Sequence, residues 1–146
     1  MVNVGSLAGD ISLPFFGVYS ATKHAVEAIS DSMRVELSAF NISVSLVKPG
    51  SVRTSIVDEM SSQLDSTECL SPLYDSHLTS FKKTFDLANR YKELVMSTTE
   101  ATTDAIKHAL TSKAPHTRYL VGMDAKVIHF LDWLLPDRIM DLFYKL

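Results

Sequence analysis

The sequence has little cysteine and no clustered metal ligands. Cys69 is the single cysteine among 146 residues, so an intramolecular disulfide and a small disulfide-stabilised fold are both excluded. No Lys, Arg or His stands near Cys69 in the sequence to activate its thiol, so we expect it to be unreactive. The five histidines show no metal-ligand spacing with a cysteine or a carboxylate, and we expect no metal site.

The sequence also lacks an excess of either charge and any long hydrophobic run. Its 14 basic and 17 acidic residues give a net charge of -3, and the basic residues are scattered, which argues against nucleic-acid binding. No apolar run reaches the roughly 18 residues of a membrane span, and the first residues lack the pattern of a signal peptide. We expect an intracellular protein, either cytoplasmic or peripheral to a membrane.

Strand and helix patterns alternate along the chain. Residues 2–6 and 42–47 are short apolar runs typical of buried strands, and residues 18–40 between them have helical periodicity. A strand–helix–strand unit implies a parallel sheet and an α/β fold. The apolar stripe of the 18–40 helix consists of Ala21, Ala25, Ala28, Ile29, Met33 and Leu37. Further helices are predicted at residues 73–96, 97–113, 124–135 and 137–146, with a short helix at 55–62, a polar loop at 63–72, a third strand at 118–121 and a turn at 48–54. Asn41 is predicted to be a left-handed cap at the end of the 18–40 helix, and Ser97 and Glu100 fit a capping box at the start of the 97–113 helix.

Three short motifs occur at the ends of these elements. The first is Asn-Val-Gly-Ser-Leu-Ala-Gly at residues 3–9, which places Ser6 at the end of a strand. The second is Tyr-Ser-Ala-Thr-Lys at residues 19–23, and the third is Lys-Pro-Gly-Ser-Val-Arg-Thr at residues 48–54. Each motif alone has an ordinary explanation, because the second can be a surface pair one helical turn apart and the third only a turn.

Together, in this order and on these elements, the three motifs resemble the short-chain dehydrogenase/reductase family. The resemblance is specific over residues 1–55 and looser further along the chain. Residues 27–40 and 98–126 look like the branch that includes the retinol and hydroxysteroid dehydrogenases. The resemblance implies an oxidoreductase that transfers a hydride between NAD or NADP and a hydrophobic alcohol or carbonyl.

The resemblance also implies a fold and a division of the chain. The fold is the C-terminal part of a Rossmann-like, doubly wound parallel sheet of about three strands with flanking helices, without the N-terminal cofactor-binding βαβ units. Residues 1–54 would form the catalytic core. Residues 55–113 would form the substrate-loop and helical region, and residues 114–146 the last strand and the C-terminal helices.

The chemistry of the first two motifs agrees with these implied roles. Tyr19 and Lys23 lie one helical turn apart and share a face. An ammonium group close to a phenol favours the phenolate, so Tyr19 can exchange a proton with an alcohol or a carbonyl near neutral pH. Ser6 can hydrogen-bond the same substrate oxygen. By resemblance, Tyr19 and Lys23 also contact the cofactor, and Lys23 bonds its nicotinamide ribose.

The third motif is expected to lie beside the nicotinamide. By resemblance, the cofactor-binding residues there are Pro49, Gly50, Val52 and Thr54, with the Val52 backbone on the carboxamide and the Thr54 hydroxyl nearby. Gly50 has no side chain, so its backbone can come close to a flat ligand. Parallel α/β sheets bind ligands beyond the carboxyl ends of their strands, which is where this loop begins.

An apolar loop separates the first motif from the second. Its residues are Leu13, Pro14, Phe15 and Phe16. They can pack the loop against the body of the protein, or they can form one wall of a hydrophobic substrate pocket. The second interpretation suits a retinoid, steroid or other lipid-like alcohol.

Glycine is scarce, and this is the main departure from the family. The five glycines never form the glycine-rich turn that binds a dinucleotide. The sequence also opens in a predicted buried strand, where a natural domain rarely begins. We therefore expect a fragment, a truncated gene model or a short isoform with little or no activity alone. The rival hypothesis is a non-catalytic truncated isoform that docks on a full-length dehydrogenase subunit.

Two surfaces have open interpretations. The stripe on the 18–40 helix can pack inside the chain or against another subunit. The second interpretation comes from the resemblance, because members of the short-chain dehydrogenase/reductase family commonly dimerise through this helix. The C-terminal segment 127–146 is apolar and contains Trp133, Phe143 and Tyr144. Its helices can cover the substrate pocket or the sheet, or they can make peripheral membrane contact.

Overall fold

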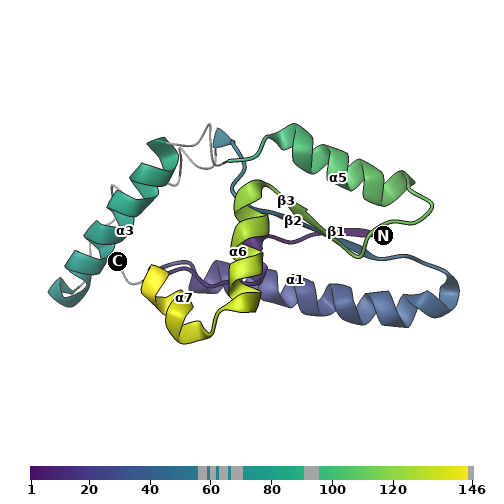
Figure 1. The fold of residues 1–146 in the computed structure, drawn as a ribbon, viewed down its shortest axis with the longest axis horizontal. Coiled ribbons are helices and arrows are strands. Elements are labelled where there is room, and N and C mark those ends of the chain that lie inside the picture. Colours follow the sequence, from purple (N-terminus) through teal and green to yellow (C-terminus); the bar gives the residue numbers. More distant parts are fainter. Residues whose placement is uncertain (56–58, 60–61, 63–65, 67–70, 91–95, 145–146) are drawn as a thin grey trace.

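The fold is a parallel three-stranded sheet between helices (Figure 1). The computed structural model describes residues 1–55, 59, 62, 66, 71–90 and 96–144. The strands β1 (Val2–Val4), β2 (Ser45–Pro49) and β3 (Arg118–Val121) pair in the order β1-β2-β3. Helix α1 (Gly17–Glu36) runs along one face of the sheet and α5 (Thr99–Thr111) along the other. The predicted α/β architecture is confirmed.

The central strand is buried on both faces, which explains its apolar sequence. Leu46 and Val47 are 2% and 0% exposed, as expected for a parallel strand covered by helices on each side. The predicted turn at residues 48–54 is wrong at its start, because Lys48 and Pro49 continue β2. Lys48 is completely buried. Hydrophobic patterning could not predict that Lys48 is buried. A lysine is almost never buried unless it is paired, and the pattern does not show the partner.

Helix α1 turns its predicted apolar stripe away from the sheet. Ile29 is 56% exposed, whereas Ser20 and Ser30 on the inner side are 0% and 3% exposed. The Oγ of Ser30 accepts from Asn3 Nδ2 at 2.9 Å and donates to the Val26 carbonyl, so small polar residues fix α1 against β1. Within the part of the chain that the structure describes, the stripe is therefore not core. The helix continues as a 3-10 turn, η2 (Leu37–Phe40), and ends at Asn41 with φ 57°, the predicted left-handed cap.

The remaining helices follow the predicted order with small shifts at their described ends, and residues 91–95 and 145–146, at two of the predicted ends, lie outside the described residues. Helix α3 spans Pro72–Arg90, α6 Met123–Leu134 and α7 Asp137–Tyr144. The N-cap of α5 is Thr98, whose Oγ1 accepts from the Ala101 N–H at 3.4 Å, rather than the predicted Ser97. Most of the predicted short helix at residues 55–62, most of the polar loop 63–72 and Cys69 lie outside the described residues.

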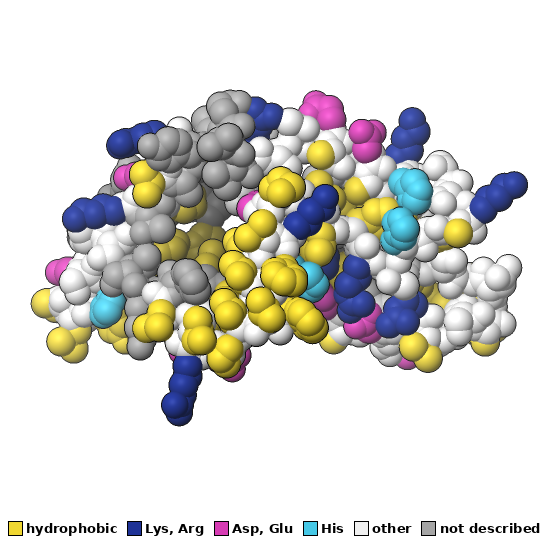
Figure 2. Space-filling model, in the orientation of Figure 1, with side chains coloured by type: hydrophobic (Ala, Val, Ile, Leu, Met, Phe, Trp, Pro, Cys, Tyr) yellow, Lys and Arg dark blue, Asp and Glu magenta, His cyan; other side chains and the backbone are white. Residues whose placement is uncertain are grey.

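The C-terminal helices pack by one side and expose the other. Ala125 of α6 joins Leu7 and Ile11 in a core cluster, with Ile128 against it. On the opposite side, Phe130 and Trp133 are 55% and 77% exposed, and Figure 2 shows hydrophobic side chains gathered over this part of the molecule. None of the described helices combines the length and the apolarity needed to cross a membrane. Membrane contact through this side stays a prediction.

Candidate active site

Ser6 lies where β1 turns into a short 3-10 helix, η1 (Leu7–Gly9). Its Oγ accepts from the Ala8 N–H at 3.2 Å, and Ser6 is thereby the N-cap of η1. The neighbouring Gly5 N–H donates to the Val47 carbonyl at 2.8 Å, so the strand end is held by β2. The hydroxyl is partly exposed and fixed by the turn at the carboxyl end of the sheet. This is the position that the first motif predicted.

Tyr19 and Lys23 occupy the first turns of α1, beside this strand end. Lys23 Nζ lies 5.7 Å from the centroid of the Tyr19 ring. The same ammonium donates to the Val4 carbonyl at 3.4 Å, two residues before Ser6 in the chain. Tyr19 is 45% exposed, so part of this residue faces solvent. The structure therefore brings the predicted acid/base residue and the predicted cation together, next to the strand that carries Ser6.

The apolar loop before α1 packs against α3 through aromatic rings. Phe15 and Phe16 lie 5.3 Å and 5.8 Å, centroid to centroid, from Phe81, which is only 6% exposed. Phe16 also meets the Tyr19 ring edge-on at 6.5 Å, and Phe85 lies 6.3 Å from Phe81. Leu13 is 37% exposed and Pro14 is half-buried. The rings of this loop are therefore packed against α3, and its role as a wall of a substrate pocket stays a prediction.

Phe81 and Phe85 were not among the predicted site residues. The sequence signal for them is two phenylalanines one helical turn apart, which predicts an apolar helix face but not its target. Phe15 has an unusual backbone conformation, because its φ of 66° lies in the left-handed region. A bulky residue in the left-handed region is strained, and such strain occurs most often at functional sites. The aromatic contact with Phe81 offsets part of that cost.

The predicted cofactor loop is held by backbone contacts from two directions. The Gly50 N–H donates to the Val121 carbonyl at 2.9 Å, and Val52 pairs with Ser97 in an isolated parallel bridge. Pro49 ends β2, and Thr54 is partly buried a few residues later. The four predicted residues therefore lie on one loop at the carboxyl end of β2, and their role toward a cofactor stays a prediction.

Asp124 lies beside this loop, and the sequence did not identify it as a site residue. It lies in the first turn of α6, and its Oδ2 accepts from the Ser51 N–H at 2.6 Å. The carboxylate fills a notch made by two glycines, because a Cβ built on Gly50 or on Gly122 would lie 2.4 Å from its Oδ1. Gly122 also has φ +102°, which a residue with a side chain rarely adopts. The weak sequence signal was an acidic residue at a helix start.

Replacing Gly50 with alanine is expected to destabilise the protein by about 1–3 kcal/mol, the usual cost of overpacking. The new methyl group would collide with Asp124 and displace the carboxylate from the Ser51 N–H. The measurement is urea unfolding of the purified chain. Gly17→Ala is the matched control: a Cβ there meets nothing within 4 Å, so its stability should stay equal or rise by about 0.4–1 kcal/mol. Equal stabilities of the two variants would contradict the close packing of the Asp124 carboxylate against Gly50.

The described histidines make ordinary contacts. His108 Nδ1 lies 2.8 Å from the Tyr119 hydroxyl, which also accepts from the His116 N–H at 2.9 Å. His24 Nδ1 lies 2.8 Å from the Ser20 carbonyl. No group of three or more His, Cys, Asp or Glu side chains is placed to hold a metal ion in the described ranges.

Comparison with known proteins agrees with this geometry. The sequence profile of a family described as short chain dehydrogenase matches residues 1–65, which contain all three motifs. The rat (Rattus norvegicus) protein "Retinol dehydrogenase 16" is 36% identical over 153 residues, which cover 99% of this chain and 47% of the relative. The chain belongs to the short-chain dehydrogenase/reductase family. Rat "17-beta-hydroxysteroid dehydrogenase type 6" is also 36% identical, over 147 residues that cover 97% of this chain and 46% of the relative.

Within the family, the chain therefore falls in the branch of retinol and hydroxysteroid dehydrogenases. It spans about half the length of the curated relatives it matches. A solved short-chain dehydrogenase from Streptomyces avermitilis superposes with a TM-score of 0.64 at 25% identity, covering 91% of this chain and 46% of that one.

Two further structures share the fold at lower identity. One, from Burkholderia cenocepacia, was solved in complex with NADP: its TM-score is 0.64 at 17% identity, over 99% of this chain and 46% of that one. The other, from Burkholderia phymatum, was solved with NAD: its TM-score is 0.62 at 21% identity, over 97% of this chain and 47% of that one. These matches confirm the fold class expected from the motifs.

Proposed function

We propose that this chain supplies the catalytic half of an NAD(P)-dependent oxidoreductase that acts on a hydrophobic alcohol or the matching carbonyl. The observation that carries the proposal is the Tyr19–Lys23 pair, held on α1 beside the strand end that bears Ser6. A phenol, an ammonium and a hydroxyl at one sheet edge suit proton exchange with a substrate oxygen.

Each residue has a distinct part in the proposed reaction. Ser6 would hydrogen-bond the substrate oxygen and orient it. Tyr19 would take the hydroxyl proton of an alcohol at its own phenolic oxygen, or return a proton to a carbonyl oxygen. Lys23 would stabilise the phenolate. The nicotinamide, when bound, supplies the hydride acceptor or donor.

The residues present fit the nicotinamide end of such a cofactor. Lys23 has three N–H donors, and the contact with the Val4 carbonyl uses one of them, which leaves donors for ribose hydroxyls. The loop formed by Pro49, Gly50, Val52 and Thr54 would flank the nicotinamide. The 146 residues contain no glycine-rich turn for the pyrophosphate, so we expect little or no turnover from the isolated chain.

The aromatic cluster favours a retinoid-, steroid- or lipid-like substrate. Phe16 meets the Tyr19 ring, and Phe15, Phe81 and Phe85 extend the aromatic surface away from it. Leu13 and Pro14 lie in the same loop as Phe15 and Phe16. Large apolar rings bind polycyclic or polyene ligands by burial of apolar area and by stacking. The names of the two rat relatives, a retinol and a hydroxysteroid dehydrogenase, support the same substrate class.

The second candidate is a non-catalytic role in which the chain docks on another dehydrogenase subunit. The outward stripe of α1 supports it, because its Ile29 is 56% exposed and two further apolar residues of the helix, Val18 and Val35, are 85% and 65% exposed. The same stripe would serve for pairing with a second copy of the chain. Apolar faces this exposed usually mark an interaction surface.

A graft tests both candidates. In rat retinol dehydrogenase 16, this chain would replace the matching segment, and NAD(P)-dependent oxidation of retinol would be measured. Turnover by the graft and weaker cofactor binding by its Lys23→Ala variant are expected, with no turnover by the isolated chain. Three results together would refute the catalytic role. The graft would be folded, as judged by circular dichroism, and it would be inactive. The Lys23→Ala substitution would leave its cofactor affinity unchanged. Co-purification of the inactive chain with the intact rat enzyme would favour docking.

A further inference from the structure

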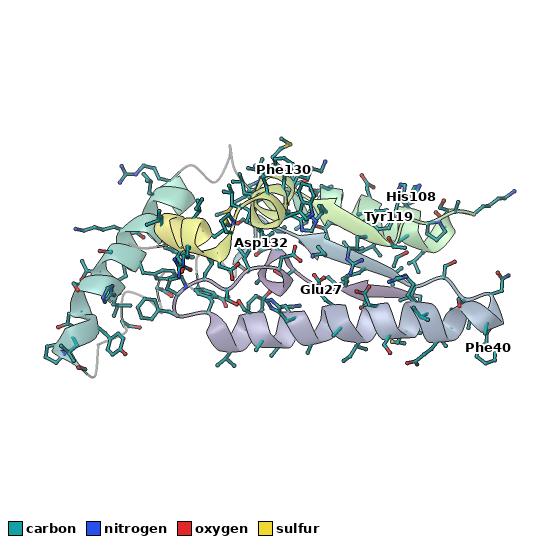
Figure 3. The ribbon with its side chains drawn as sticks, turned by 60° about the horizontal axis from the view of Figure 1, so that its bottom comes forward. Glu27, Phe40, His108, Tyr119, Phe130 and Asp132 are labelled. Atoms are coloured by element: carbon teal, nitrogen blue, oxygen red, sulfur yellow. The ribbon has the colours of Figure 1, made fainter. Side chains whose placement is uncertain are left out.

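A buried lysine joins the two segments that carry the proposed catalytic residues. Lys48 of β2 is 0% exposed, and its Nζ lies 2.5 Å from Glu27 Oε1. The same Nζ also donates to the Asp10 carboxylate. Lys48, Asp10 and Glu27 are here called the Lys48 cluster. Figure 3 shows Glu27 between α1 and the sheet.

The two carboxylates belong to the elements that hold the site. Asp10 ends the η1 turn, four residues after Ser6, and Glu27 lies one helical turn beyond Lys23 on α1. These elements pack without space for a side chain between them. A Cβ built on Gly9 would lie 2.9 Å from Glu27 Oε1 and 3.1 Å from the Lys23 carbonyl. The ammonium of Lys48 therefore links the turn after Ser6 (η1) to the helix that carries Tyr19 (α1).

Each carboxylate has a second partner from another element. His129 Nδ1 of α6 lies 2.8 Å from Asp10 Oδ2. Arg118 of β3 approaches Glu27 Oε2 at 3.9 Å and bonds Asp31 Oδ2 at 2.6 Å. Burial acts to raise the pKa of Asp31, but the hydrogen bonds from Arg118 and Arg34 outweigh it and hold that pKa below its usual value. Asp10 and Glu27 are thus oriented from two sides.

A cluster of this kind contributes orientation rather than much net stability. Removing charges from water costs several kcal/mol per ion, and the mutual attraction only roughly offsets that cost. Apolar side chains of similar volume would hold the same elements together about as strongly. They would not fix the relative positions of two oxygen atoms and one nitrogen, as the charge-assisted hydrogen bond from Lys48 to Asp10 and the close ion pair of Lys48 with Glu27 do.

We propose that Lys48, Asp10 and Glu27 are positioning residues, which set the Ser6 turn and the Tyr19–Lys23 helix in register for proton exchange. The proposal rests on the proposed function of the site. Ser6 and Tyr19 must reach one substrate oxygen from two separate elements. A misplacement of about 1 Å in such an arrangement lowers turnover by about 10²-fold.

The test is an apolar version of the cluster, Lys48→Met/Asp10→Leu/Glu27→Met, in the 146-residue chain and in the graft. We expect urea unfolding close to wild type, faster hydrogen exchange in the Ser6 turn and the first turns of α1, and a kcat about 10- to 100-fold lower with little change in KM. A purely structural cluster would leave kcat and local exchange unchanged once stability is restored, and that result would overturn the proposal.

Further variants keep the outcome decisive. If the triple variant does not fold, Asp10→Asn and Glu27→Gln replace it, because each keeps the side-chain shape, removes the negative charge and exchanges one acceptor oxygen for an NH2 donor. A lower kcat at unchanged KM in either supports positioning, and wild-type kcat in both refutes it. Tyr19→Phe separates the two claims: if it leaves turnover intact, the proposed function fails, and hydrogen exchange alone then decides whether the cluster sets the register.

Discussion

Replacing Tyr19 with phenylalanine is expected to lower kcat of the grafted enzyme by about 10²–10⁴-fold, the usual contribution of a positioned general acid or base. The substitution removes the hydroxyl and keeps the ring. The edge-on contact with Phe16 at 6.5 Å and the position of the ring near Lys23 should therefore persist. Because Tyr19 is 45% exposed, stability should change little.

The measurement is steady-state oxidation of retinol, with KM and kcat determined separately. KM should change far less than kcat, since the hydroxyl acts mainly in the transition state. Tyr74→Phe is the matched control, because Tyr74 is also exposed, at 59%, and lies on α3. A Tyr19→Phe enzyme within about threefold of wild type would mean that another group exchanges the proton.

Replacing Lys48 alone with methionine should destabilise the chain by about 3–5 kcal/mol, the cost of leaving a buried charge without its partner. The side chains of Asp10 and Glu27 are only 13% and 14% exposed, and both would lose the ammonium between them. The partners that remain are weaker, because Arg118 Nε is 3.9 Å from Glu27 Oε2 and His129 is charged only when protonated.

Urea unfolding of the 146-residue chain measures this loss. Lys126→Met provides the control, since Lys126 is exposed on α6 and should change stability by no more than about 0.5 kcal/mol. If Lys48→Met proved as stable as Lys126→Met, the carboxylates would have to be solvated or protonated, and the cluster could not fix their positions.

The parts of the fold that follow local patterns were predictable from the sequence. The strand at residues 118–121 and the cap at Asn41 depend on short-range features, namely β-branched or apolar runs and a tolerance of left-handed backbone. The positions of the site motifs were predictable for the same reason, because Ser6, Tyr19 and Lys23 each lie within one strand end or one helical turn. Their catalytic roles stay predictions.

Features that depend on distant partners were not predictable. Lys48 pairs with a carboxylate 38 positions away, and Asp10 meets His129 across 119 positions. Nothing in a local pattern brings these charges together, and a lysine before Pro-Gly is most simply interpreted as part of a turn. The contact of Phe81 with the loop before α1 was missed for the same reason.

The orientation of α1 shows a different limit. Periodicity predicted the helix, but the larger apolar stripe faces outward, and Ser20 and Ser30 face the sheet. Small side chains allow a close approach and can hydrogen-bond to the neighbouring strand, so they pack well without being hydrophobic. A hydrophobic stripe identifies a surface that is to be covered, and it does not say whether the same chain covers it.

The Lys48 cluster has a consequence for how this sequence can vary over evolutionary time. Because one cation serves two carboxylates, loss of Lys48 leaves two largely buried carboxylates without their ammonium, whereas loss of Asp10 or Glu27 leaves the ammonium with the other carboxylate. After loss of Lys48, neutral residues at positions 10 and 27 would remove both unpaired charges, so the effects of substitutions at the three positions are not additive. In lineages related to this one, a change at position 48 should therefore occur together with changes at positions 10 and 27.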